Sequence, residues 1–183
     1  MRLFTAIDLS DEVRANIEAL QAKLKPTARI QWSPSSNLHI TTKFIGAWPP
    51  EQLDELIAAL RSIPPAGPIK IQTRNVGWFS KGDTPHTFWA GIQAPPALYD
   101  LALATDAATH ALGVEAETRQ YTPHLTLARV RNREPLNALK QAIASLEPIE
   151  FGSFTASRYH LYLSEPSRDG TIYSKLTEFP IIS

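Results

Sequence analysis

Two short segments, one in each half of the chain, constrain the fold more than any other sequence feature. NLHITTKFIG begins at Asn37 and TPHLTLARVR begins at Thr122, and both are apolar-rich runs with His-x-Thr at the same offset. Their histidines, His39 and His124, lie 85 positions apart in a chain of 183 residues. A helical pattern and then a strand-hairpin pattern follow each segment. The repeat predicts two similar lobes related by a pseudo-two-fold axis.

The remaining sequence predicts helices mixed with strands. Apolar residues recur at helical spacing in segments 11–25, 51–63, 95–112 and 135–146. β-rich runs predict strands at 2–8, 30–32, 38–45, 69–79, 86–92, 122–130, 153–163 and 172–179. Because many of these strands are hairpin-connected, the order indicates an α+β fold with antiparallel or mixed sheets. No linker divides the chain, so we expect residues 1–183 to form a single bilobal domain.

Composition excludes several classes of function. Lysine plus arginine number 18, as do aspartate plus glutamate, so the formal net charge is zero. This balance argues against charge-driven coating of duplex nucleic acid, but it permits recognition of one phosphate or one strand end. The absence of cysteine excludes thiolate nucleophiles and zinc–thiolate sites. No signal-peptide pattern and no run of about 20 apolar residues is present, so we expect a soluble, cytoplasmic protein.

The repeated motif carries groups that suit phosphodiester chemistry. Alternate side chains of a strand share a face, so His39 points the same way as Thr41, and His124 the same way as Thr126. If the two strands meet, two imidazoles and two hydroxyls converge. One neutral imidazole can take a proton from water and one imidazolium can protonate the leaving oxygen, while the threonines donate hydrogen bonds to the non-bridging oxygens. This chemistry needs no metal.

One His-x-Thr has little value by itself, since a half-buried strand often contains both residues. Two copies in matched strand contexts favour function. Among the other histidines, His86 is expected to be solvated, His110 to interact with carbonyls at a helix end, and His160 to face either the cleft or solvent. Three or four converging ligands would be needed for a metal site, and no His-x-x-x-His or Glu-x-x-His spacing provides them. We therefore expect no metal and no cofactor.

With these motifs, the chain resembles the 2H phosphoesterase superfamily, named for its two His-x-Thr/Ser-x signatures. It is most similar to the bacterial and archaeal RNA 2′,3′-cyclic phosphodiesterases, also called 2′-5′ RNA ligases. The resemblance covers nearly the whole length. It includes RLFTAIDLSDEVR, NLHITTKFIG, FWAGI, RQYTPHLTLAR and FGSFTASRYHLYLS. Thr42 departs from the aliphatic residue often found at its place.

The resemblance implies a fold and a reaction. The expected fold has two lobes whose antiparallel sheets flank a V-shaped cleft, with helices on the outside. The expected reaction opens a terminal 2′,3′-cyclic phosphate of RNA to leave a 2′-phosphomonoester. By motif position, His39 is similar to the proton donor and His124 to the proton acceptor. The residue types alone do not distinguish these roles. The same site is expected to join RNA ends through a 2′-5′ linkage when a 5′-hydroxyl replaces water.

Three further residues are candidates for substrate binding. Lys43 shares the parity of His39 along the strand, which predicts that it faces the phosphate. Relatives carry an arginine that looks like a phosphate ligand at the place of Arg129, but strict alternation puts Arg129 on the face opposite His124 unless a bulge intervenes. Phe44 is a candidate to stack on a base. The other stacking candidates are Trp32, Trp78 and Phe79, and core packing is favoured for Phe44 and Trp78.

Two alternatives remain open at this stage. One is a phosphodiesterase for other small cyclic or 2′-5′-linked nucleotides, and the other is a non-catalytic module that binds RNA ends. A zinc hydrolase is disfavoured. The expected partners are RNA 3′ ends with 2′,3′-cyclic phosphate, including tRNA fragments or small nucleotides, and the protein is expected to be a monomer with no membrane partner.

Overall fold

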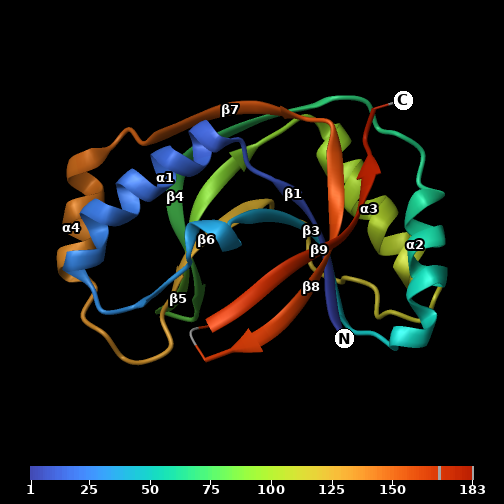
Figure 1. The fold of residues 1–183 in the computed structure, drawn as a ribbon. Coiled ribbons are helices and arrows are strands. Elements are labelled where there is room, and N and C mark those ends of the chain that lie inside the picture. Colours follow the sequence, from blue (N-terminus) through green and yellow to red (C-terminus); the bar gives the residue numbers. More distant parts are fainter. Residues whose placement is uncertain (169, 183) are drawn as a thin grey trace.

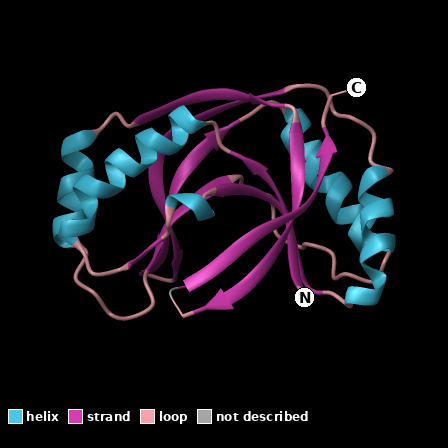
Figure 2. Ribbon diagram, viewed as in Figure 1, coloured by secondary structure: helices cyan, strands magenta, loops and turns pink. Residues whose placement is uncertain are grey.

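The computed structural model describes residues 1–168 and 170–182 and has two antiparallel sheets (Figures 1 and 2). The first sheet has the strand order β3-β1-β8-β9, and the second has the order β2-β6-β5-β4-β7. The first sheet consists of β1 (Arg2–Asp8), β3 (His39–Ala47), β8 (Arg158–Ser167) and β9 (Gly170–Pro180). The second consists of β2 (Gln31–Trp32), β4 (Ile69–Lys81), β5 (Thr84–Gln93), β6 (His124–Arg129) and β7 (Glu150–Ala156).

The helices lie outside the sheets, and two of them cross between lobes. The four α-helices are α1 (Asp11–Leu24), α2 (Leu53–Arg61), α3 (Pro96–His110) and α4 (Asn137–Leu146), and 3₁₀ turns span Lys25–Thr27, Ser35–Asn37 and Pro50–Gln52. Helix α1 follows β1 of the first sheet but packs on β7 of the second, beside α4. Helix α3 follows β5 of the second sheet but packs on β3 of the first, beside α2 (Figure 1). Each lobe therefore includes a helix whose preceding strand belongs to the other lobe.

The crossing helix α1 shows how the sequence specifies these elements. Ser10 caps it, because its hydroxyl accepts a hydrogen bond from the amide of Val13 at 3.3 Å. The apolar residues expected on one face are buried, which fixes the side of the helix that meets the second sheet; they are Val13, Ile17, Leu20 and Leu24. This stripe joins a single core cluster that includes Ile7 and Ile40 of the first sheet with Phe88 and Leu125 of the second.

The fold class predicted from the sequence is confirmed, and one predicted strand is wrong. Segment 153–163 was expected to be one strand, but it contains the end of β7 and the start of β8. β7 pairs with β4 in the second sheet, whereas β8 pairs with β1 and β9 in the first. The chain thus changes sheet at Ser157. The alternation of apolar and polar residues shifts phase at this point, because Ser157 and Arg158 are consecutive polar residues. Such a shift reports a change in burial and not the identity of the partner strand.

No helix in residues 1–168 and 170–182 is both long and apolar enough to cross a membrane.

Candidate active site

The strand of the first motif, β3, has a bulge within the motif. Its ladder with β1 pairs Thr41 with Ala6 and then Lys43 with Thr5. Thr42 is therefore the extra residue, opposed by no residue of its own on β1. Its side chain is buried, and its hydroxyl lies 2.7 Å from that of Thr5.

The strand of the second motif, β6, has a bulge at the equivalent place. Its ladder with β5 pairs Thr126 with Trp89 and then Ala128 with Phe88, which leaves Leu127 as the extra residue. Both bulges fall three residues after the motif histidine. The burial of the first six residues of β3 and β6 follows the same sequence along both strands. The two halves therefore repeat the position of the β-bulge as well as the His-x-Thr motif.

The bulges decide which residues share a face with the motif. Directly paired residues of an antiparallel ladder share a face. Lys43 shares the face of Thr5, so the expectation that it shares the face of His39 is wrong. Its side chain nevertheless lines the cavity that His124 borders. Arg129 lies on the same face as His124, because the bulge at Leu127 of β6 shifts the alternation of side chains by one residue. The positive charge of Arg129 acts on His124, where it lowers the imidazole pKa.

The aromatic candidates separate in the same way. Phe44 pairs with Phe4 on the motif face and is 55% exposed, so the expectation that it packs in the core is wrong. Trp78 and Trp32 pack against the core. Phe79 is half-buried and lies edge-on to His124, with ring centroids 4.8 Å apart. Phe44 and Phe79 are therefore the aromatic candidates that remain available to a ligand.

His39 is enclosed by aromatic rings of the first sheet. Its ring centroid lies 4.6 Å from that of Phe4, 5.1 Å from that of Tyr173 and 6.0 Å from that of Tyr162. Burial lowers the pKa of His39 to about 4, against the opposing effects of a hydrogen bond to the backbone of Asn37 and the charge of Asp8. His39 is therefore neutral at pH 7 in the free protein.

His124 has the same backbone contact in a more open setting. Its Nδ1 lies 2.8 Å from the carbonyl oxygen of Thr122, two residues earlier, as Asn37 is two residues before His39. A carbonyl only accepts, so Nδ1 of His124 carries the proton and Nε2 is left as the acceptor. Burial lowers the pKa of His124, with the Thr122 hydrogen bond opposing this effect. His124 is thus poised as a neutral base.

Three of the four motif residues, His39, Thr41 and His124, line two cavities. The His124 cavity has a volume of about 560 Å³, and its lining includes His124, Thr41, Phe44 and Phe79. The His39 cavity has a volume of about 490 Å³ and is lined by Asp8, Arg14, Ser36, Leu38, His39, Tyr162, Tyr173 and Lys175. His39 of one cavity and Thr41 of the other are two residues apart on β3, a spacing of about 7 Å along a strand. The charge of His124 acts on His39, and β3 contacts β6.

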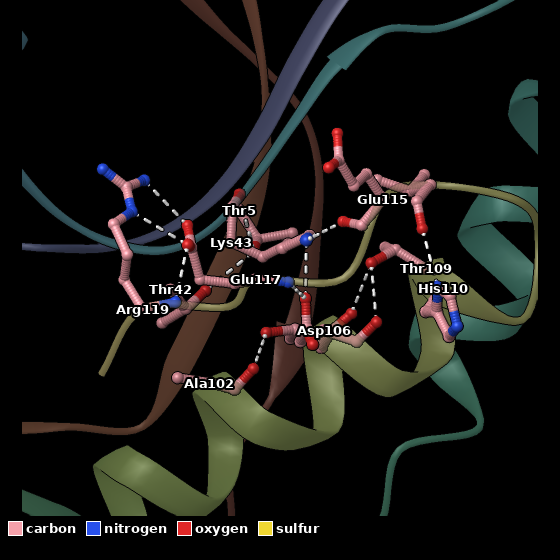
Figure 3. Close-up of polar contacts among 12 residues, drawn as sticks. Thr5, Thr42, Lys43, Ala102, Asp106, Thr109, His110, Glu115, Glu117 and Arg119 are labelled. Carbon is pink, nitrogen blue, oxygen red and sulfur yellow. Dashed lines mark hydrogen bonds and ion pairs between the residues drawn. The ribbon is translucent and has the colours of Figure 1, made fainter. Parts of the chain in front are cut away.

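Lys43 anchors the segment that leads to the second motif (Figure 3). Its ammonium donates to Asp106 Oδ1 at 2.5 Å and to the carbonyl of Glu115 at 2.8 Å. Asp106 also accepts from the amide of Glu117 at 3.1 Å, and both carboxylate oxygens of Glu117 hold the guanidinium of Arg119 at 2.9 Å. Glu117 and Arg119 line the His124 cavity. Lys43 therefore ties β3 to the chain that precedes His124.

Comparison with known proteins gives one consistent result. The family model described as LigT like phosphoesterase matches residues 7–89 and 92–173, and each matched segment contains one motif histidine. The chain belongs to the LigT like phosphoesterase family. It is 33% identical to the RNA 2′,3′-cyclic phosphodiesterase of Methanocaldococcus jannaschii over 98% of this chain and 100% of that protein. The crystal structure of TT0787 of Thermus thermophilus superposes with a TM-score of 0.84 at 27% identity, covering 99% of this chain and 98% of that one.

A second similar solved structure is that of LigT of Escherichia coli complexed with 3′-AMP. It superposes with a TM-score of 0.80 at 25% identity over 100% of this chain and 98% of that one. The predicted resemblance and the predicted two-lobed fold are thereby confirmed. The predicted class of enzyme, a phosphoesterase, is confirmed as well.

Several residues of this LigT like site were not found from the sequence. Asp8 lines the His39 cavity and accepts hydrogen bonds from Tyr162 and Lys175. Tyr121 donates from its hydroxyl to the carbonyl of Thr41 at 2.9 Å. His160 lies neither in the His39 cavity nor in solvent but in a further cavity, which shares Asp8 and Lys175 with the His39 cavity. The strand parity of Asp8 was readable, but the partners of Asp8 and Tyr121 lie on elements far away in the sequence.

Proposed function

We propose that this protein hydrolyses the terminal 2′,3′-cyclic phosphate of RNA to a 2′-phosphomonoester, with His39 and His124 as its acid–base pair. The observation that carries the proposal is the matched geometry of β3 and β6. Each strand offers an imidazole and a hydroxyl on one face, followed by a bulge at the same place. The names of the relatives, RNA 2′,3′-cyclic phosphodiesterases, support the choice of substrate.

The reaction is an in-line displacement at phosphorus. Nε2 of His124 takes a proton from water, whose oxygen forms the new P–O bond. The bond from phosphorus to the ribose 3′ oxygen breaks, and His39 gives its proton to that oxygen. The phosphate lies between His39 of one cavity and His124 of the other, so that an imidazole stands on each side of it. No metal and no cofactor takes part.

The remaining motif residues stabilise the charge that develops on the phosphate. The hydroxyls of Thr41 and Thr126 donate hydrogen bonds to the non-bridging oxygens. Arg129 adds a positive charge from the face of His124, where the β6 bulge places it. The ammonium of Lys43 is held by Asp106, so its role is to position the chain before His124 and not to bind phosphate.

The terminal nucleoside occupies the His124 cavity, whose apolar walls suit a nucleobase. Phe44 is more than half exposed there and Phe79 borders His124, so both are placed to stack on a base. When a 5′-hydroxyl of RNA takes the place of water, the same displacement forms a 2′-5′ linkage, because the chemistry at phosphorus is unchanged and reversible.

The decisive assay uses a short RNA that ends in 2′,3′-cyclic phosphate, incubated with the protein in excess chelator. We expect complete conversion to an RNA with a 2′-phosphate end, identified by its migration and by resistance to a 3′-phosphate-specific phosphatase. A 3′-phosphate product would reverse the assigned direction of displacement. Loss of activity in chelator would favour a metal hydrolase.

Substrate competition separates the remaining alternatives. RNA with a cyclic end is compared with a 2′,3′-cyclic mononucleotide and with 2′-5′ oligoadenylate at equal concentration. We expect kcat/KM to be highest for the RNA. A higher kcat/KM for 2′-5′ oligoadenylate would instead make the protein a phosphodiesterase for 2′-5′-linked nucleotides. Binding of RNA ends without turnover, unchanged in His39→Ala and His124→Ala, would make the protein a binding module.

A further inference from the structure

The residues that face the two histidines from the neighbouring strand differ. Across the ladder between β1 and β3, Asp8 pairs with His39. At the equivalent place in the ladder between β5 and β6, Gly91 pairs with His124. The position opposite the motif histidine therefore carries a carboxylate in the first lobe and only the hydrogen atom of a glycine in the second. This is a difference in charge at positions that the backbone makes equivalent.

Asp8 is built into its place. It is half-buried, its Oδ1 accepts from the hydroxyl of Tyr162, and its Oδ2 accepts from the ammonium of Lys175. Although burial by itself raises the carboxyl pKa of Asp8, these hydrogen bonds outweigh it and lower the pKa, so Asp8 is ionised at neutral pH. On its other side, Nδ1 of the buried His160 lies 3.7 Å from Oδ2 and has no hydrogen-bond partner among the described residues.

Asp8 supplies the negative charge of the His39 cavity. Of the residues that line it in the described part of the chain, Asp8 is the one carboxylate. The other charged or titratable groups facing His39 come from every element around it; they are Arg14 of α1, Tyr162 of β8, Tyr173 and Lys175 of β9, and His124 of β6. Hence the positive charge on a protonated His39 has one anionic group to stabilise it before substrate binds.

The charged residue near His124 is positive, in contrast to Asp8 near His39. Arg129 lies on the face of His124 beyond the β6 bulge and disfavours a second positive charge there. The residue at the equivalent place in β3 is Phe44, which is neutral. A carboxylate near one imidazole and a guanidinium near the other both favour the state in which His39 carries the proton and His124 does not.

We propose that Asp8 is a positioning residue that, by its charge, directs the catalytic proton to His39 and so makes His39 the donor of the pair. This inference rests on the proposed two-histidine function. Burial holds the pKa of His39 well below its ordinary value. Two contributions from the protein oppose this effect, first the hydrogen bond with the backbone of Asn37 and then the charge of Asp8.

The test is an NMR titration of the imidazole resonances of His39 and His124, assigned with His39→Gln and His124→Gln. In Asp8→Asn, which keeps the size of the side chain and removes its charge, we expect the pKa of His39 to fall below its wild-type value of about 4. The pKa of His124 should be nearly unchanged. At pH values above the pKa of His39, each unit by which this pKa falls lowers the protonated fraction of His39, and with it the rate, by about tenfold.

Three further variants make the result specific. Asp8→Glu keeps the charge and should restore much of the rate. Lys175→Met removes the cation on Asp8 and should raise the pKa of His39, which is a shift of the opposite sign. Glu178→Gln is the matched control, because Glu178 lies near His160 but not in the His39 cavity, and it should change neither imidazole. If Asp8→Asn does not fold, the sign of the Lys175→Met shift still decides.

The pH dependence of kcat/KM gives an independent readout, since it reports the free protein. Both histidine pKa values lie below 6.5, so the singly protonated pair of the wild type is most populated below pH 6.5. Asp8→Asn should lower the maximum and move the limb set by His39 to lower pH. A rate loss at every pH with both limbs and both resonances unmoved would overturn the inference and leave the proposed function intact. An inactive wild-type protein would overturn the proposed function instead.

Discussion

The two motif strands have the same backbone and different surroundings. In β3 and in β6 a histidine begins the strand, a threonine follows two residues later, and the next residue is the extra one of a bulge. Yet His39 is surrounded by aromatic rings, whereas His124 borders the larger cavity. In the proposed function, the shared backbone brings one imidazole to each side of a phosphate. The neighbours that differ would then give the two imidazoles different tasks.

The residues after the bulges show the same division. Lys43 and Ala128 hold equivalent places, and so do Phe44 and Arg129. In the first half the buried position carries a cation that anchors the chain before His124, and the exposed position carries an apolar ring. In the second half the buried position is small, and the exposed one carries the cation. The same repeated backbone thus carries a buried, ion-paired cation in one lobe and an exposed cation in the other.

The largest expected effect tests whether the two halves act as one site. His39→Ala and His124→Ala should each lower kcat by about 10²–10⁴-fold, because each removes one proton transfer. The double variant should be little slower than the slower single variant, since two residues that act in one step are not additive. Steady-state rates on RNA with a cyclic end measure this. Losses that multiply in the double variant would mean that the histidines act independently.

A second effect compares the hydroxyls on the motif face with a hydroxyl behind it. Thr41→Val and Thr126→Val should each lower kcat by about 10²-fold, because each removes a donor to the developing charge. Thr42→Val is the matched control. Its hydroxyl is buried against Thr5 behind the motif, so its loss should cost about 1–2 kcal/mol of unfolding free energy with the rate kept. A rate loss in Thr42→Val equal to that in Thr41→Val would contradict the assigned faces.

The sequence was sufficient for the features that depend on local periodicity. The faces of His39, Thr41, His124 and Thr126 follow from strand alternation. The place of Lys43 does not, because a bulge depends on how two strands far apart in sequence are paired.

The change of sheet at Ser157 was missed for a related reason, since the phase shift in the alternation there does not say which strand each segment pairs with. Asp8 was overlooked because its partner His39 lies on another strand, and one carboxylate at a strand end has no signature of its own. What the sequence lacked in both cases was the identity of the neighbouring strand.

A third effect compares the two cations that follow the bulges. Lys43→Met leaves the carboxylate of Asp106 without its buried partner, and the unfolding free energy should fall by about 3 kcal/mol. Arg129→Gln removes an exposed charge, so stability should change by less than about 0.5 kcal/mol while KM rises about tenfold. Denaturant unfolding and steady-state kinetics on both variants measure the contrast. If Lys43→Met raised KM as Arg129→Gln does, at unchanged stability, Lys43 would be a phosphate ligand after all.

Stability is the property in which we expect no difference between the two halves. Helices α1 and α3 each pack on the sheet that the preceding strand does not belong to, and one hydrophobic cluster includes residues of both sheets. Neither lobe can therefore lose its core while the other keeps its own, and residues 1–183 should unfold as one domain in a single transition.

The distribution of tryptophan allows a direct test of this single transition. Trp32, Trp78 and Trp89 belong to the second sheet, whereas Trp48 follows β3 of the first and is buried. In Trp48→Phe, fluorescence reports the second lobe alone while far-ultraviolet circular dichroism reports both. The two signals should share one midpoint in denaturant, in this variant as in the wild type. Separate midpoints would show that the lobes are independent folding units, and the crossing of α1 and α3 would then be an exchange of helices without energetic coupling.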